Sequence, residues 1–344
     1  MTERVLSLRE LNRATLARQL LLERRRLPVA RAVERVGGLQ AQWPAAPYVG
    51  LWARLAGFRP ETLERALLAG EVVKATLMRS TLHLVTARDY PSFSTALRDV
   101  RWGDEAALAD AERVAADIRE LVAAGPTRLQ DALDHLDRAH GLRDLHARRV
   151  WHMARVRAHV HHAPETALWK ARPQAVFVAL DEPAGIELHA ARAEVARRYL
   201  AAFGPATRAD LADWSGLRVG DFAAALAALE PLRRFRDENG RELLDLPRAP
   251  LPSAETPAPV RFLPKWDSVL LAHADRRRVL PEAYRKAVIR KNGDVAQTVL
   301  VDGLVAGTWQ VERGRVVAEP FAPLARAVRR ELDDEAARLE AFLR

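Results

Sequence analysis

Cysteine is absent from the 344-residue sequence, and so are long apolar runs. Without cysteine the chain has no disulfide bond, no thiol nucleophile and no zinc or iron–sulfur site with a cysteine ligand. No stretch approaches the ~18 consecutive apolar residues of a membrane-spanning helix. The charged amino terminus also lacks the apolar core of a signal peptide. We therefore expect a cytoplasmic protein that does not enter membranes.

Lysine is scarce, yet the chain is basic, with a formal net charge of +9. The only lysines are Lys74, Lys170, Lys265, Lys286 and Lys291. A basic surplus favours a polyanionic partner such as nucleic acid. Heavy use of arginine also follows from a GC-rich genome, so composition leaves both explanations open and the clustering of the arginines has to decide.

The first part of the chain has the pattern of several helices followed by a hairpin. Ser7 and Glu10 form a capping-box pattern that predicts a helix start. Helices are predicted over residues 7–24, 28–36, 45–55 and 60–70, and strands over residues 72–73 and 82–85. Helices followed by a hairpin are typical of a winged helix.

This plan is predicted to recur. Thr127 and Thr207 each precede a Gln or Asp by three residues, a helix-start pattern, and the two lie ~80 residues apart. After Thr127 we predict a helix over residues 147–158 and a wing near Val160. After Thr207, apolar residues at helical spacing predict a helix over 219–229, and Asn239-Gly240 predicts a hairpin turn.

The carboxy-terminal part changes to strands after a proline-rich stretch. Strands are predicted over residues 261–263, 298–301, 304–309 and 316–317, and a last helix over residues 324–343. We predict a mainly α fold with β wings (α+β), with three tandem winged-helix modules and a small C-terminal antiparallel β domain. The predicted units are residues 1–88, 89–185 and 186–247 for the modules, 248–259 for the linker and 260–344 for the β-rich domain with its closing helix.

Residues 37–44 (Gly-Gly-Leu-Gln-Ala-Gln-Trp-Pro) contain the candidate catalytic pair, Gln40 and Gln42. A glutamine amide offers a carbonyl acceptor and an NH2 donor, so two of them can fix one water beside an electrophile. Such a site suits a reaction whose leaving group is already activated. The alternative is that both glutamines only cap helix ends.

Four segments together resemble the AlkZ-like family of winged-helix DNA glycosylases, which includes the AlkZ and YcaQ branches. They are residues 38–48, 78–86, 204–211 and 270–276. The resemblance implies excision of N7-alkylated purines from double-stranded DNA, and some members also unhook interstrand crosslinks. The family's glutamine-apolar-glutamine motif maps onto Gln40, Ala41 and Gln42. The YcaQ-like branch carries aspartate at the third place, so Gln42 places this chain with the AlkZ branch.

The chemistry that this resemblance implies needs little from the protein. A purine alkylated at N7 is a cationic leaving group, so the enzyme has only to orient a water and stabilise an oxocarbenium-like sugar. We expect Gln40 and Gln42 to do this, with Gln42 in the more direct role. Lyase chemistry needs an amine that forms a Schiff base. Because no lysine lies in the motif, we expect an abasic-site product, and we expect no cofactor and no metal.

Two further clusters are candidate DNA-binding residues. Alternation along a strand would place Arg79, Thr81 and His83 on one face, toward DNA or a neighbouring module. In the second cluster the arginines could hold phosphates while the histidine points at the lesion; its candidate residues are His273, Asp275, Arg276 and Arg277. The alternative for this second cluster is a solvated run of charges.

Seven of the ten histidines lie between His135 and His162. No HExxH pattern or partner-carboxylate spacing accompanies them, so we expect surface or phosphate contacts and not a metal site.

The expected partner is double-stranded DNA with alkylated purines, bound by a monomer that requires no protein partner and associates with the nucleoid when on DNA. The alternative function is a winged-helix transcription regulator without enzymatic activity. Such a regulator would dimerise on a palindrome, and its glutamines would be structural.

Overall fold

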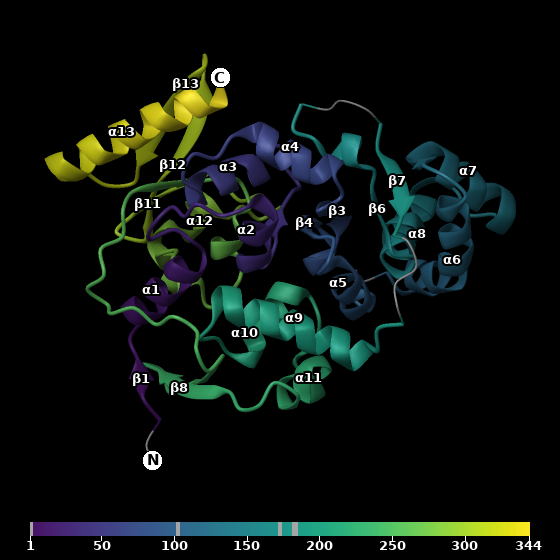
Figure 1. Cartoon of the computed structure of the whole chain (residues 1–344), viewed down its shortest axis with the longest axis horizontal. Coiled ribbons are helices and arrows are strands. Elements are labelled where there is room, and N and C mark those ends of the chain that lie inside the picture. Colours follow the sequence, from purple (N-terminus) through teal and green to yellow (C-terminus); the bar gives the residue numbers. More distant parts are fainter. Residues whose placement is uncertain (1–2, 101–103, 171–173, 181–184) are drawn as a thin grey trace.

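The computed structural model describes residues 3–100, 104–170, 174–180 and 185–344. Helices run through the whole chain, and the described residues form four small sheets between them (Figure 1). The fold is therefore a mixed α+β fold, as expected. Among the described helices, none combines the length and the apolar character needed to cross a bilayer.

The first segment contains the four predicted helices and the predicted hairpin. Its elements are β1 (Val5–Leu6), α1 (Leu8–Arg18), α2 (Val29–Arg35), β2 (Leu39–Gln40), α3 (Ala46–Arg54), α4 (Pro60–Leu68), β3 (Val72–Thr76), the short turn η1 (Met78–Ser80) and β4 (Leu82–Thr86). The capping box of Ser7 and Glu10 is confirmed. Helix α1 ends six residues earlier than predicted, at Arg18, and Leu20 has a φ of 57°. A left-handed residue cannot continue a right-handed helix.

The second segment is a helical unit with a small sheet. Its elements are α5 (Tyr90–Leu97), α6 (Glu105–Ala123), β5 (Thr127–Arg128), α7 (Leu129–His140), α8 (Asp144–Arg157), β6 (Val160–His162), η2 (Pro164–Ala167) and β7 (Val176–Ala179). The helix expected over 147–158 is part of α8, and the strand near Val160 is present. Thr127, in contrast, does not cap α7. It lies in β5 and its hydroxyl donates to the carbonyl of Gly125, so the helix starts without it.

The third segment confirms two local predictions. Its elements are α9 (Leu188–Phe203), α10 (Arg208–Ser215), η3 (Val219–Phe222), α11 (Ala223–Ala227), β8 (Arg233–Asp237) and β9 (Glu242–Asp245). Thr207 and Asp210 form the capping box of α10, and β8 and β9 pair as the Asn239-Gly240 hairpin. The helix predicted over 219–229 is a single 3-10 turn followed by the five-residue α11.

The carboxy-terminal segment contains the predicted antiparallel sheet, whose strand order is β10-β11-β12-β13. The strands are β10 (Arg261–Leu263), β11 (Thr298–Val301), β12 (Leu304–Glu312) and β13 (Arg315–Pro320). The short helical elements η4 (Ser268–Leu270), η5 (Arg276–Arg278), η6 (Glu282–Tyr284) and α12 (Arg285–Val288) connect β10 to β11, and α13 (Arg326–Leu343) closes the chain. Residues 247–259 contain no helix or strand, as expected of a linker.

Segments far apart in the sequence share cores. Strand β1 pairs in parallel with β8, and one apolar core combines residues 73–100 with residues 191–272. Two buried ion pairs add cross-links: Arg18 Nη1 lies 2.7 Å from Asp245 Oδ1, and Arg54 Nη2 lies 2.8 Å from Asp267 Oδ1. Removing one partner of such a pair would leave an unpaired buried charge, at a cost of about 3–5 kcal/mol. The division into three winged-helix modules stays a prediction.

Candidate active site

The glutamine motif begins at two glycines that set its path. Gly37 and Gly38 have φ values of 75° and 91°, a region that favours glycine. A Cβ on Gly38 would lie 3.1 Å from the carbonyl oxygen of Leu84, so the chain passes close to β4 here. Because the chain lies this close to β4, Leu39 and Gln40 pair with it as strand β2. The pairing is antiparallel and sets Gln40 opposite His83.

The two glutamine amides use their oxygens in the same way. Gln40 is buried, and its Oε1 accepts a 3.3 Å hydrogen bond from Arg79 Nη2. Gln42 is exposed, and its Oε1 accepts a 3.2 Å hydrogen bond from the backbone N–H of Leu82. A carbonyl oxygen has two lone pairs, so each amide keeps one acceptor position. Neither amide serves as a helix cap.

Arg79 is held in a strained turn and not in an extended strand. Its φ is 51°, and it lies in η1, with its Nη1 donating a 2.6 Å hydrogen bond to the carbonyl of Trp214 in α10. Burial lowers the pKa of Arg79 to about 10, despite the nearby carboxylate of Asp213. The prediction that Arg79, Thr81 and His83 share one face of an extended strand is therefore wrong, because the chain turns at residues 78–80 and Arg79 lies outside the strand.

The same turn is fixed from a second side. His152, on α8, donates from Nε2 to the carbonyl of Ser80 over 3.1 Å, while its Nδ1 accepts from Arg155. Thr81 closes the turn, with its hydroxyl donating to the carbonyl of Met78. Burial and the charge of Arg155 lower the pKa of His152 to about 4, so this histidine is neutral near pH 7.

His83 is a buried, neutral neighbour of Gln40. Its Nδ1 donates to the carbonyl of Thr81 over 3.0 Å, so its Nε2 is an acceptor. Burial lowers the pKa of His83 to about 3, and the charge of Arg79 adds to this effect. Among the described residues, Nε2 of His83 has no hydrogen-bond partner.

The second predicted cluster divides between the core and the surface. His273 is 1% exposed, and its Nε2 donates to the carbonyl of Phe203 over 3.0 Å. Burial lowers its pKa to about 3. The ring is therefore placed inside the protein, where a lesion cannot contact it without a rearrangement. Asp275 instead receives hydrogen bonds from the exposed Arg277 and from Arg241 of the β8–β9 hairpin.

Arg276 is the residue of this cluster whose charge acts on Arg79. Its Nη2 lies 4.0 Å from Asp213 Oδ2, and its charge acts on Arg79. Helix α10 thus brings together η1 and η5, because Asp213 and the Trp214 carbonyl lie at its end. No sequence signal identified Asp213, Trp214 or His152 as residues near the η1 turn, since their helices are remote in the sequence.

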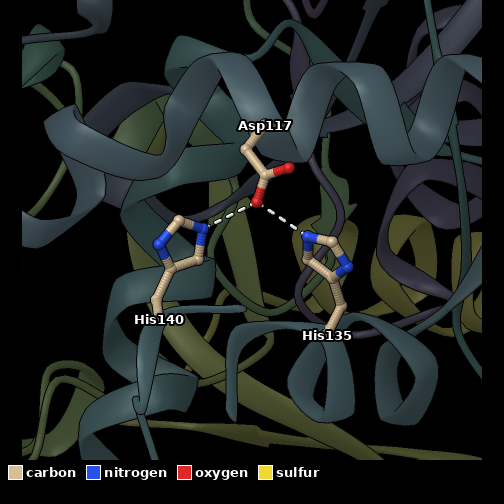
Figure 2. A group of neighbouring side chains, drawn as sticks. All are labelled: Asp117, His135 and His140. Atoms are coloured by element: carbon tan, nitrogen blue, oxygen red, sulfur yellow. Dashed lines mark hydrogen bonds and ion pairs between the residues drawn. The ribbon is translucent and has the colours of Figure 1, made fainter. Parts of the chain in front are cut away.

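The histidine-rich segment is mostly not a surface patch. His161 and His162 are buried in β6, and His152 supports the η1 turn. His135 and His140 converge on one carboxylate, Asp117 of α6, as Figure 2 shows. The sequence prediction missed this carboxylate because it lies 18 residues before the first of the two histidines.

The sequence of this chain matches a known protein family, and its fold matches a solved structure. A family model described as "DNA glycosylase AlkZ-like" matches residues 33–342, and the chain belongs to this family. Among solved structures, it is similar to the Streptomyces sahachiroi DNA glycosylase AlkZ, with a TM-score of 0.81 and 20% sequence identity over 98% of this chain and 97% of that one. No curated protein sequence matches the chain. The resemblance inferred from the motifs is confirmed.

Proposed function

We propose that this protein hydrolyses the N-glycosidic bond of N7-alkylated purines in double-stranded DNA and leaves an abasic site. The observation that carries this proposal is the placement of the Gln-Ala-Gln motif in a member of a DNA glycosylase family. Gln40 is fixed by Arg79, and the exposed Gln42 follows two residues later, just past the end of β2.

The free acceptor positions of the two amides support the mechanism. A purine alkylated at N7 departs as a neutral base, so the glycosidic bond breaks with little assistance and positive charge develops on the sugar. Gln42 is exposed and is the amide that can contact the sugar and the attacking water directly. Gln40 stands behind it and orients the water. Preorganised dipoles of this kind act by positioning and electrostatic stabilisation.

The exposed position of Gln42 also supports a broad tolerance for adducts. A base held by an interstrand crosslink cannot rotate freely into a closed pocket, as most base-excising enzymes require. An amide at a strand end can meet a bulky or tethered lesion in the groove. Unhooking of crosslinks is therefore part of the proposal.

The register of the sheet argues against lyase chemistry. Lys74 lies in the same sheet as Gln40, but its partner on β4 is Leu84, whereas the partner of Gln40 is His83. Successive residues of a strand point to opposite faces. Lys74 therefore lies on the other face of the sheet from Gln40 and cannot form a Schiff base at the same sugar.

The two candidate DNA-binding clusters have different proposed roles. Arg276 and Arg277 of η5 contact phosphates, because Arg277 is exposed and Arg276 lies near Asp213, whose carboxylate acts on Arg79. Arg79 acts by holding Gln40. The protein acts as a monomer on damaged DNA, without a protein partner.

The experiment measures base release from a duplex that carries one N7-methylguanine, under single-turnover conditions. The wild type is compared with Gln40→Ala and Gln42→Ala, and with Gln310→Ala as a matched control, because Gln310 is an exposed glutamine of β12 whose side chain donates to Glu312. We expect release by the wild type and the control, and a loss of at least about 100-fold in both motif variants. Borohydride should trap no covalent adduct.

Absence of release from this duplex and from duplexes with bulkier N7 adducts would refute the proposal. Unchanged release in both motif variants would refute the role of the glutamines. Each variant is first checked for its melting temperature and its affinity for the duplex, so that a loss of rate is not a loss of folding.

A further inference from the structure

Asp117, His135 and His140 form a compact cluster between two helices, away from the glutamine motif. Asp117 lies on α6, and both histidines lie on α7 (Figure 2). Nε2 of His135 and Nε2 of His140 each lie 2.7 Å from Asp117 Oδ2. The three ligand atoms lie within 4.8 Å of one another, and each side chain is partly exposed.

The donor set is the one that zinc prefers in proteins. Two imidazole nitrogens with one carboxylate oxygen form a ligand set that zinc sites use, and a water can complete four-coordination from the solvent side. Zinc bonds of about 2.0–2.2 Å would set the ligand atoms roughly 3.3 Å apart in a tetrahedron. Reaching that geometry from the present one requires movements of about 1 Å or less in the Asp117 contacts, which rotations of partly exposed side chains can supply.

We propose that Asp117, His135 and His140 bind one zinc ion that joins α6 to α7. In the structure the two imidazole N–H groups occupy the positions that the ion would take between nitrogen and oxygen. The ion replaces both hydrogen bonds with metal bonds from the same three side chains. Its effect is on stability, because it ties two helices of the core that contains Ile118, Leu133 and Leu136.

One neighbouring side chain, Arg113, opposes binding of the ion. Arg113 Nη1 lies 3.2 Å from Nδ1 of His140 and donates to it, which keeps the proton of that ring on Nε2. Zinc on Nε2 moves this proton to Nδ1, where the arginine then has no acceptor. Arg113 is about half exposed and also pairs with Asp110, so it can turn away. Arg113 therefore weakens zinc binding without preventing it.

The test uses the full-length protein after dialysis against a chelator. Zinc is titrated in competition with a chromophoric chelator, and Co2+ is used as a spectroscopic substitute. We expect one equivalent of tight binding and the visible absorption of four-coordinate Co2+. His135→Ala and His140→Ala should each weaken zinc binding at least about 100-fold, since loss of a supporting residue alone costs 10–100-fold. His146→Ala is the matched control, because His146 pairs with Asp110 and not with Asp117.

Arg113→Ala supplies a test that misfolding cannot imitate. It should tighten zinc binding about tenfold, because zinc binding breaks the hydrogen bond from Arg113 to His140 Nδ1 in the wild type and the variant has no such bond to lose. Zinc should also raise the melting temperature of the wild type and of Arg113→Ala, and leave both ligand variants unchanged. The proposal is overturned if the wild type binds no tight equivalent, if His146→Ala loses as much affinity as the ligand variants, or if Arg113→Ala fails to tighten binding. None of these outcomes depends on glycosylase activity.

Discussion

Arg79 connects Gln40 to helix α10. One guanidinium nitrogen lies 3.3 Å from Gln40 Oε1, and another lies 2.6 Å from the carbonyl oxygen of Trp214. Three stretches that are remote in the sequence thus meet at one side chain. The guanidinium fixes which end of the Gln40 amide faces η1, and its own position depends on a carbonyl 135 residues away.

Replacing Arg79 by alanine should reduce the rate of base release more than the affinity for DNA. Without the guanidinium the Gln40 amide can rotate, and small misplacements at a reacting centre cost up to about 100-fold in rate. We expect single-turnover base release to fall by about 10–100-fold in Arg79→Ala. Arg79→Lys should rescue little, because one ammonium cannot replace two differently directed N–H groups.

The affinity for a duplex with an uncleavable analogue serves as the companion measurement for Arg79. If affinity falls as much as rate does, Arg79 is a DNA contact and not a positioning residue.

Arg277 should behave in the opposite way. It is exposed and lies on η5, so its loss should remove one phosphate contact and leave the chemistry intact. In Arg277→Ala the slope of log affinity against log salt concentration should become shallower by about 1, whatever the DNA sequence. Arg344→Ala, which removes the same charge at the end of the chain, should leave this slope unchanged. Equal slopes in Arg277→Ala and the wild type would exclude Arg277 from the interface.

Gly38 should be intolerant of a side chain. Its φ of 91° disfavours any other residue, and an added Cβ would meet the Leu84 carbonyl at 3.1 Å. We expect Gly38→Ala to lower the free energy of unfolding by at least about 1 kcal/mol, measured by urea unfolding. Gly220→Ala is the control, since nothing lies within 4 Å of its added Cβ. It should be neutral or slightly stabilising, and a similar loss in both variants would contradict this account.

Mild acid should destabilise the protein through its buried histidines. The folded-state pKa values of His83 and His273 are about 3, whereas an unfolded histidine has a pKa of about 6.5. Between these values the unfolded chain binds protons that the folded chain does not. The free energy of unfolding therefore falls as pH falls below about 6.5, by up to about 2 kcal/mol per histidine by pH 5.

The measurement for this prediction is urea unfolding at pH 7 and pH 5. His273→Asn should reduce the loss between the two pH values, because its amide carries no titrating group. His189→Gln is the control, since His189 is exposed and its variant should show the loss of the wild type. An undiminished loss in His273→Asn would show that His273 is not the group that titrates. Carboxyl groups with a lowered pKa, such as that of Asp275, reduce the free energy of unfolding only below about pH 4, which separates their effect from that of the histidines.

Local chemistry made several elements predictable from the sequence. The capping boxes at Ser7 and Thr207 place two helix starts, because their bonds join residues three apart. The Asn239-Gly240 turn and the C-terminal strands are equally local. Thr127 shows the limit: the same pattern failed there because its hydroxyl found the Gly125 carbonyl and the segment entered a sheet.

By itself the sequence determined the family and several helix starts and strands, and it singled out Gln40 and Gln42, since all of these reside in short motifs. Only the tertiary structure decided what surrounds them. Arg79 left the expected strand face because the chain turns at η1, and His273 entered the core. Asp117 met its two histidines across a helix pair. Such contacts depend on how helices pack, and packing is set by apolar burial over the whole chain and not by the spacing of any one motif.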